Sequence, residues 1–197
     1  MGKAPTGSSG GAPYNNPLRY VRSLQPSRID QGVDYTGEGP VYAIGPAVVV
    51  QTAPNTAGGW PGGGFIAYRL TDGPDAGQYV YVAENVTPKV RVGDRVDWTT
   101  QIADMHGPIE TGWAAPPPNL GLALAGVLGQ FHGENPTPLG ENFNRLMVTL
   151  GAPSGRGPGA GSPGSGPPLP GGGGGAGCVP GAALIAMAHG MLVTRRQ

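Results

Sequence analysis

Between residues 28 and 113, short apolar stretches alternate with stretches that favour turns. The apolar stretches are rich in β-branched and aromatic residues, and several alternate apolar with polar positions as a half-buried strand does. They are VYAI, AVVVQT, FIAYRL, YVYVAENV, VRVGDRV, TTQIADM and IETGWA, at 41–44, 47–52, 65–70, 79–86, 90–96, 99–105 and 109–114. Because these stretches are short and evenly spaced, with no helical pattern of 10–15 residues between them, the pattern predicts an antiparallel all-β fold, a sandwich or a barrel-like sheet.

A helical pattern follows the last predicted strand. Four apolar residues in ENFNRLMVTLG recur at the spacing of one helical face, namely Phe143, Leu146, Met147 and Leu150. Gly151 comes next and is typical of the end of a helix. The pattern predicts a short helical appendage at about 141–150 that covers the sheet.

Composition divides the rest of the chain. Residues 1–16 are a Gly/Ser/Pro/Asn arm with few side chains to bury, so we expect a disordered arm. The β-domain then covers 17–152 and begins with the amphipathic stretch PLRYVRSL, which we expect to pack the arm against the domain. Residues 153–181 are a Gly/Pro-rich linker, predicted to be disordered, and 182–197 form a short apolar segment. That segment could dock on the β-domain, contact a partner or begin a longer element.

Charge and cysteine content exclude several classes of protein. The 12 Lys and Arg residues equal the 12 Asp and Glu residues, whereas a nucleic-acid-binding protein normally carries a basic excess. The single cysteine, Cys178, cannot form an internal disulfide framework. No run of 18 apolar residues predicts a membrane span, and the N-terminus lacks the apolar core of a secretory signal. If the protein acts outside a cell, we therefore expect a route of release other than a classical leader, and the compartment stays open.

Four blocks of the chain carry a resemblance to a known family. RIDQGVD at 28–34 is similar to its signature Arg-x-His-x-Gly-x-Asp, apart from the histidine. The other three blocks, in the same order as in the family, are GPVYAIGPAVVVQT at 39–52, VAENVTPKVRVGDRV at 82–96 and TTQIADMHGPIETGWA at 99–114. On these motifs the stretch of about 85 residues resembles the lysostaphin-type (LytM-type, duplicated hybrid motif) peptidoglycan endopeptidases. The resemblance implies their β-fold and a role at the bacterial cell wall.

The resemblance does not carry over the zinc chemistry of that family. Those enzymes hold zinc with His, Asp and His and use another histidine in catalysis, and only Asp34 matches a metal ligand here. Asp30 stands in place of the first ligand and Glu84 in place of the catalytic histidine. The last ligand position falls on Ile109 or Thr111, or on Glu110 after a slip of one residue. We therefore expect no zinc, no cofactor and no assigned catalytic residue, since a set of oxygen ligands would suit Ca²⁺ or Mg²⁺ better.

If the fold holds, four carboxylates converge on the former active-site floor: Asp30, Asp34, Glu84 and Glu110. Carboxylates gathered in a half-buried site raise one another's pKa values, so one of them could stay protonated near neutrality. Trp60 or Trp113 offers an aromatic face for a ligand. Three interpretations remain open at this stage: a polar relic, a groove that binds a glycan or peptide without catalysis, and a glycoside hydrolase with a carboxyl pair.

The sequence thus predicts a non-catalytic, peptidase-like module with a structural or peptidoglycan-binding role, such as a phage virion or tail-associated protein. The alternative is a cell-wall hydrolase, either a carboxylate-based glycosidase or an atypical metallopeptidase. Expected partners are peptidoglycan or another glycan, and protein neighbours contacted through the N-terminal arm and the C-terminal segment. The glycine-rich stretch at 58–64 lacks the Lys-Ser/Thr and the helix of a phosphate-binding loop, so we expect it to rim the groove instead.

Overall fold

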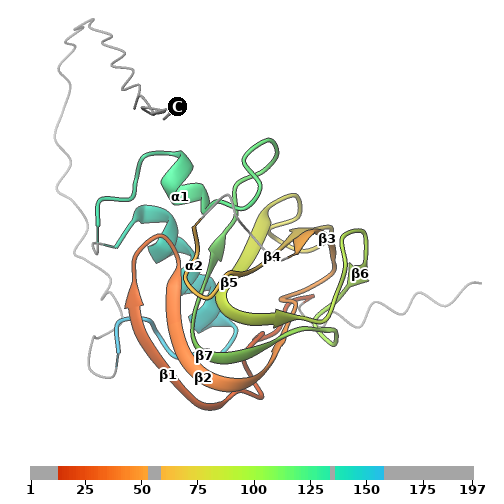
Figure 1. Ribbon diagram of the computed structural model, residues 1–197, viewed down its shortest axis with the longest axis horizontal. Helices are drawn as coiled ribbons and strands as arrows, with labels where there is room; N and C mark the ends of the chain where they lie inside the picture. Colours follow the sequence, from red (N-terminus) through yellow and green to blue (C-terminus); the bar gives the residue numbers. More distant parts are fainter. Residues whose placement is uncertain (1–12, 53–58, 134–135, 158–197) are drawn as a thin grey trace, which may run out of the picture. The chain divides into compact units, whose positions relative to one another are not determined.

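The computed structural model describes residues 13–52, 59–133 and 136–157 (Figure 1). The chain divides into two units, 1–160 and 161–197, and the second unit lies wholly outside the described residues. The predictions for residues 1–12, for the linker beyond 157 and for the apolar segment at 182–197 therefore concern parts of the chain that the structure does not describe.

The described chain forms one antiparallel sheet with two helices, so the predicted all-β fold is confirmed. The strands are β1 (Arg22–Ile29), β2 (Val33–Tyr42), β3 (Ala47–Thr52), β4 (Gly64–Leu70), β5 (Tyr79–Pro88), β6 (Arg95–Val96) and β7 (Gln101–Trp113). The helices are α1 (Leu124–Val127) and α2 (Pro138–Thr149). The strands pair in the order β1-β2-β7-β5-β4-β3-β6, and Figure 1 shows that the sheet is strongly curved. No helix among the described residues is long and apolar enough to cross a membrane.

The main hydrophobic core lies on one face of this sheet. Side chains of a strand point alternately to the two faces, so alternate residues of the central strands enter the core. The largest of the fully buried side chains in this core are Tyr35, Ile44, Ile66, Tyr68, Leu70, Ile102, Met105 and Ile109. Helix α2 adds Phe143 and Met147, both fully buried. The prediction of a covering helix with this apolar face is therefore confirmed, although the helix begins three residues earlier than expected.

The helix begins where it does because Thr137 caps it. The Thr137 hydroxyl accepts a hydrogen bond from the Gly140 N–H at 2.9 Å, and Pro138 occupies the first turn, where a missing N–H costs nothing. The same hydroxyl donates to the Asp30 carbonyl oxygen at 2.7 Å. This contact ties the start of α2 to the turn between β1 and β2.

A second, smaller apolar cluster lies on the opposite face of the sheet. Its fully buried members in β4 and β5 are Phe65, Ala67, Tyr81 and Ala83, which alternate with the core residues of the same strands. Ala114 and Ala123, which follow β7, cover part of it, and Trp60 packs against it from the loop before β4. This face of the sheet positions the candidate site.

Four strands differ from the prediction. Strand β2 begins at Val33, eight residues before the predicted stretch at 41–44, and ends at Tyr42. The first strand, β1, is an edge strand whose residues are mostly exposed and include Pro26, so its sequence lacks the apolar alternation of a strand. The stretches 99–105 and 109–114 form one continuous strand, β7, because β2 pairs with it straight through Gly107 and Pro108. The stretch 90–96 is strand only at its last two residues, since residues 91–94 form a turn around Gly93.

The packed domain extends beyond the predicted limits of 17 and 152. Tyr14 is buried, and its hydroxyl donates to the Asp72 carbonyl oxygen at 2.9 Å, so residues 13–16 belong to the domain rather than to the arm. Leu18 of the amphipathic stretch is also buried, as expected. At the other end, the Gly155 N–H donates to the Asn144 side chain at 2.9 Å, which holds the first residues of the predicted linker against α2.

Candidate functional site

Three charged residues form a row across the sheet, on the face opposite the main core. Arg28 of β1 pairs with Asp34 of β2, and Asp34 pairs with Glu110 of β7. Residues directly opposite each other in an antiparallel sheet point to the same face and lie close together. The strand register therefore brings together residues that are up to 82 positions apart in the sequence.

Asp30 joins this row from the tight turn between β1 and β2. Its side chain is only 2% exposed, and its carbonyl oxygen accepts hydrogen bonds from the N–H and the hydroxyl of Thr137. Two glycines make this packing possible. A Cβ atom on Gly140 would lie 2.2 Å from the Asp30 carbonyl oxygen, and one on Gly32 would lie 2.6 Å from the Tyr81 hydroxyl oxygen. Any larger residue at either position would push the turn away from α2 or from β5.

Glu84 reaches the site through an irregularity between β5 and β7. Glu84 pairs with Ile109 and Val86 pairs with Met105, so the single residue Asn85 faces the three residues 106–108 of β7. The Asn85 side chain bridges the gap by donating to the Pro108 carbonyl oxygen at 2.7 Å. Glu84 itself has a φ of 81°, a left-handed conformation that residues with a side chain seldom adopt.

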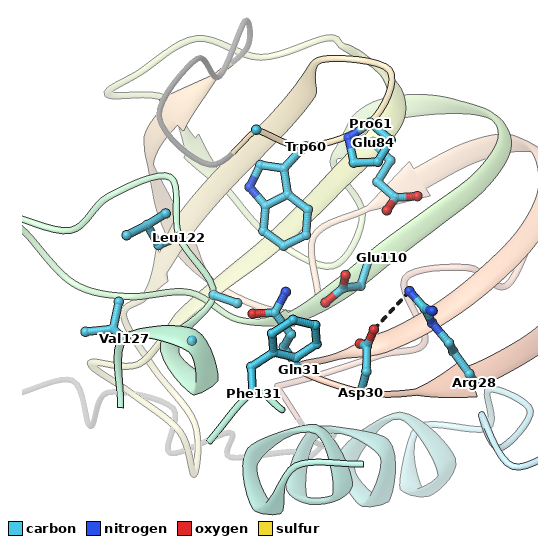
Figure 2. Close-up of a pocket in the computed structure, with 13 residues that line it drawn as sticks. Arg28, Asp30, Gln31, Trp60, Pro61, Glu84, Glu110, Leu122, Val127 and Phe131 are labelled. Atoms are coloured by element: carbon cyan, nitrogen blue, oxygen red, sulfur yellow. Dashed lines mark ion pairs between the residues drawn. The ribbon is translucent and has the colours of Figure 1, made fainter. Parts of the chain in front are cut away.

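These residues line an open groove of about 500 Å³. Its lining residues are Arg28, Asp30, Gln31, Gly59, Trp60, Pro61, Glu84, Glu110, Leu122, Ala123, Gly126, Val127 and Phe131. Figure 2 shows the carboxylates of Glu84, Glu110 and Asp30 along one side of the groove, and Leu122 and Val127 along the other. The groove therefore has an acidic side and an apolar side, as expected for the site of an amphipathic ligand.

Aromatic rings form part of the groove wall. Trp60 packs on Tyr81 with 5.2 Å between ring centroids and on Phe65 with 5.9 Å, and its indole N–H donates to the Gly121 carbonyl oxygen at 2.9 Å. These contacts hold the Trp60 ring in place without covering it completely. Phe131, which is 41% exposed, supplies a second ring at the groove.

The carboxylates are only partly neutralised. The Arg28 guanidinium forms ion pairs with Asp30, at 3.0 Å, and with Asp34. The Tyr81 hydroxyl, which is fully buried, donates a hydrogen bond to Glu110. Among the described residues that line or adjoin the groove, Arg28 is thus the single cation beside four acidic side chains.

Burial and mutual repulsion favour the protonated forms of three of these carboxyls. Burial, with Asp30 nearby, raises the pKa of Glu110 to about 8, although the Tyr81 hydrogen bond opposes the shift. Burial and the neighbouring Asp34 raise the pKa of Glu84 to about 7. Burial and Asp30 also raise the pKa of Asp34 to about 6, against the opposing effect of Arg28. The groove therefore takes up and releases protons near neutral pH.

The donor set at the site contains oxygen atoms only. One carboxylate oxygen from each of Asp30, Asp34 and Glu110 lies within 4.8 Å of the other two. Such a set fits the preferences of Ca²⁺ or Mg²⁺ and does not fit zinc, which takes nitrogen and sulfur ligands in most protein sites. The Arg28 guanidinium already supplies positive charge to two of the three carboxylates.

The structure brings together five of the six predicted site residues: Asp30, Asp34, Glu84, Glu110 and Trp60. Trp113 lies elsewhere, because it faces the main core, where its ring meets Phe143 edge-on and its N–H donates to Asn142 at 2.8 Å. The loop around Trp60 rims the groove, as expected.

The alternation of side chains along β7 also decides how the fourth motif, residues 99–114, aligns with the family's last metal ligand. Ile109 belongs to the main core, and the Thr111 hydroxyl donates to the Tyr81 carbonyl oxygen at 2.7 Å, so neither side chain lines the groove. Glu110 does, which corresponds to the alignment shifted by one residue. His106 and His132 are exposed and do not line the groove, and His189 lies outside the described residues.

Sequence reasoning missed several groove residues. Arg28 belongs to the first motif but was given no role. An arginine two residues before a buried aspartate could have indicated an ion pair between them. Tyr81 sits in the run YVYV, where alternation alone cannot tell which face is the core. Phe131 and Gln31 carry no local signal, because their positions depend on how the segment after β7 folds back over the sheet.

Comparisons with known proteins add no assignment. No protein-family model matches the chain, and no curated protein has a similar sequence.

Proposed function

We propose that this domain is a non-catalytic, peptidase-like module that binds peptidoglycan or a related glycan in the groove between Trp60 and the acidic row. The observation that carries this proposal is the composition of the groove, which combines fixed aromatic rings with buried carboxylates. A virion or tail-associated protein is the setting that we propose for such a module.

The chemistry of sugars matches this composition. A pyranose ring presents C–H groups on its faces and hydroxyl groups at its edge. The faces pack on exposed aromatic rings such as Phe131, while carboxylates accept hydrogen bonds from the hydroxyls. Glu84 and Glu110 stand on the acidic side of the groove, and Phe131 and Trp60 supply the rings.

The resemblance to peptidoglycan endopeptidases supports the choice of ligand. Asp30, Asp34 and Glu110 occupy or adjoin the positions at which that family places its metal ligands, and their oxygen atoms meet within 4.8 Å. A binding module derived from such an enzyme would keep the location of the family's site and lose its metal ligands. A groove with carboxylates in place of histidines fits this description.

Co-sedimentation with purified insoluble peptidoglycan tests the proposal. We expect wild type to bind, and Phe131→Ala to weaken binding about tenfold or more, since one aromatic contact contributes roughly 0.5–1.5 kcal/mol beyond the area it buries. Phe131 is 41% exposed, so its loss should leave the melting temperature nearly unchanged. The matched control is Phe143→Leu, which alters the core beneath α2 and should change stability while leaving affinity unaffected. Failure of wild type to bind would leave only a structural role.

The protonation of the groove favours a second candidate, glycoside hydrolysis. A glycosidase needs one protonated carboxyl as acid and a second carboxylate as base or nucleophile. At neutral pH, Glu110, with a pKa of about 8, would stay mostly protonated and serve as the acid, and the ionised fraction of Glu84, whose pKa is about 7, would serve as the base or nucleophile. Release of soluble muropeptides by wild type and its loss in Glu84→Gln, with binding retained, would favour the hydrolase over the binding module.

A further inference from the structure

The groove has more acidic side chains than the cationic residues around it can pair with. Arg28 is the one cationic residue among the described residues that line it, and its guanidinium already contacts Asp30 and Asp34. Glu84 and Glu110 form no ion pair with a described residue. Buried carboxyl groups are stable only when they are paired, hydrogen-bonded or protonated, so a ligand with a positive charge would stabilise the ionised forms of Glu84 and Glu110.

Glu110 provides a separate observation that points to a ligand. Its side chain is only 2% exposed, and one carboxylate oxygen accepts the hydrogen bond from Tyr81. No described residue donates a hydrogen bond to the other oxygen. Beside it, the Asp34 Oδ1 atom is buried without a hydrogen-bond partner among the described residues, although buried acceptors are nearly always satisfied. Figure 2 shows the Glu110 carboxylate facing the groove, between Trp60 and Asp30. A donor supplied by the ligand would complete this carboxylate.

We propose that the groove recognises a primary ammonium group of its ligand, held by Glu110 and Glu84 and flanked by the rings of Trp60 and Phe131. This inference rests on the proposed function and specifies the chemistry of the ligand. An ammonium group donates three hydrogen bonds, enough for both carboxylates, and its charge is attracted to aromatic faces. A free amine occurs on de-N-acetylated amino sugars and on the side chains of diamino acids in cell-wall peptides.

The aromatic and apolar parts of the groove limit the kind of amine. Leu122 and Val127 face the acidic side across the groove, so the ligand should carry an apolar surface next to its charge. A small hydrated cation would leave that surface without a partner. A pyranose ring or a lysine-like aliphatic chain would cover it.

Calorimetric titration of the full chain at pH 7 with two pairs of probes tests this inference. The first pair is a glucosamine tetramer and its N-acetylated counterpart, and the second is a lysine-containing tripeptide and its ε-acetylated form. We expect the amine of at least one pair to bind about tenfold to a hundredfold more tightly than its acetylated partner, as one charge-assisted hydrogen bond implies. The pair that shows the preference identifies the source of the amine.

Proton release provides a second readout. An ammonium group stabilises the ionised carboxylates, so binding should expel protons from groups whose pKa values are raised to about 7 and about 8. Titrations in two buffers of different ionisation enthalpy measure this release. Binding of an amine without release of protons would contradict the inference, because the amine would then not contact these carboxyls.

Variants locate the preference within the groove. Glu110→Gln keeps the shape of the side chain and should abolish the preference for the amine while leaving the acetylated probe unaffected. Glu84→Gln, at the half-buried edge of the groove, provides the same test if Glu110→Gln fails to fold. The matched control is Glu38→Gln, which removes one exposed charge outside the groove and should keep the preference. An equal loss in the control would overturn the inference, since the effect would then be one of overall charge.

The outcomes separate this inference from the proposed function. Equal or tighter binding of both acetylated probes would overturn the amine preference and leave glycan binding in place. Absence of binding by all four probes, together with absence of binding to peptidoglycan, would overturn both.

Discussion

At the scale of single residues, Glu84 combines two features that each lower stability. Its backbone has a φ of 81°, which costs a residue with a Cβ roughly 1–2 kcal/mol relative to glycine. Its carboxyl is half-buried beside Asp34, which raises its pKa to about 7. Strained backbone and perturbed carboxyls occur together mainly at functional sites, because function can require a geometry that folding alone disfavours.

Replacement of Glu84 separates these two features. Glu84→Gln removes the charge but keeps the Cβ atom, whereas Glu84→Gly removes both the charge and the backbone strain. We therefore expect Glu84→Gly to unfold with a free energy about 1 kcal/mol higher than Glu84→Gln, measured by urea denaturation. Both variants should bind glycan less well than wild type. A glycine variant that is less stable than the glutamine variant would show that the φ value of Glu84 stores no strain.

At the scale of secondary-structure elements, the strand register explains which site residues could be predicted from the sequence. Asp30, Asp34 and Glu84 were predicted together because the family resemblance assigns their motifs to one site, although β7 separates β2 from β5 in the sheet. Glu110 was left ambiguous with Ile109 and Thr111, since period-two alternation fixes a face only after the register with the neighbouring strand is known. Trp113 was assigned to the groove for the same reason, and alternation places it in the main core.

The connections between elements were harder to predict than the apolar strands. β1 is polar and contains Pro26, so nothing in its sequence separates it from a loop until β2 pairs with it. Gly107 and Pro108 have the composition of a turn, yet β7 continues through them because β2 holds the strand while β5 does not. The segment that carries Phe131 folds over the sheet through long-range contacts, which local propensity does not encode.

The N-terminus of α2 gives a prediction at this scale. Thr137 satisfies the Gly140 N–H and donates to the Asp30 carbonyl oxygen, so Thr137→Ala removes a helix cap and one anchor of the turn that holds Asp30. We expect a loss of roughly 1–3 kcal/mol in the free energy of unfolding. Thr137→Ser keeps the hydroxyl and should lose less than about 1 kcal/mol, since a serine caps a helix at least as well. Equal losses in thermal denaturation would contradict the role of the hydroxyl.

At the scale of the whole molecule, the raised carboxyl pKa values make stability depend on pH. A carboxyl whose pKa is higher in the folded state contributes stability below its unfolded pKa and loses that contribution as pH rises through the folded value. For Asp34, Glu84 and Glu110 the folded values are about 6, about 7 and about 8. The free energy of unfolding should therefore decrease as pH rises from about 5 to about 8.

Glu110→Gln tests this prediction. The variant cannot ionise at this position, so its free energy of unfolding should decrease less than that of wild type over the same pH range. The difference between the two decreases should be roughly 2–4 kcal/mol. Urea denaturation at pH 5, 6, 7 and 8 measures both slopes. Parallel slopes would mean that Glu110 does not hold its proton in the folded protein.

If the groove between Trp60 and the acidic row is the binding site, nuclear magnetic resonance will locate the ligand there. Titration of the ¹⁵N-labelled chain with soluble peptidoglycan fragments should shift amide signals at Asp30, Gln31, Trp60, Glu84 and Glu110. Signals on the opposite face, such as that of Trp113, should move little. We expect saturable shifts that are confined to the groove. Shifts that centre on another face, or no shifts at millimolar fragment, would contradict this expectation.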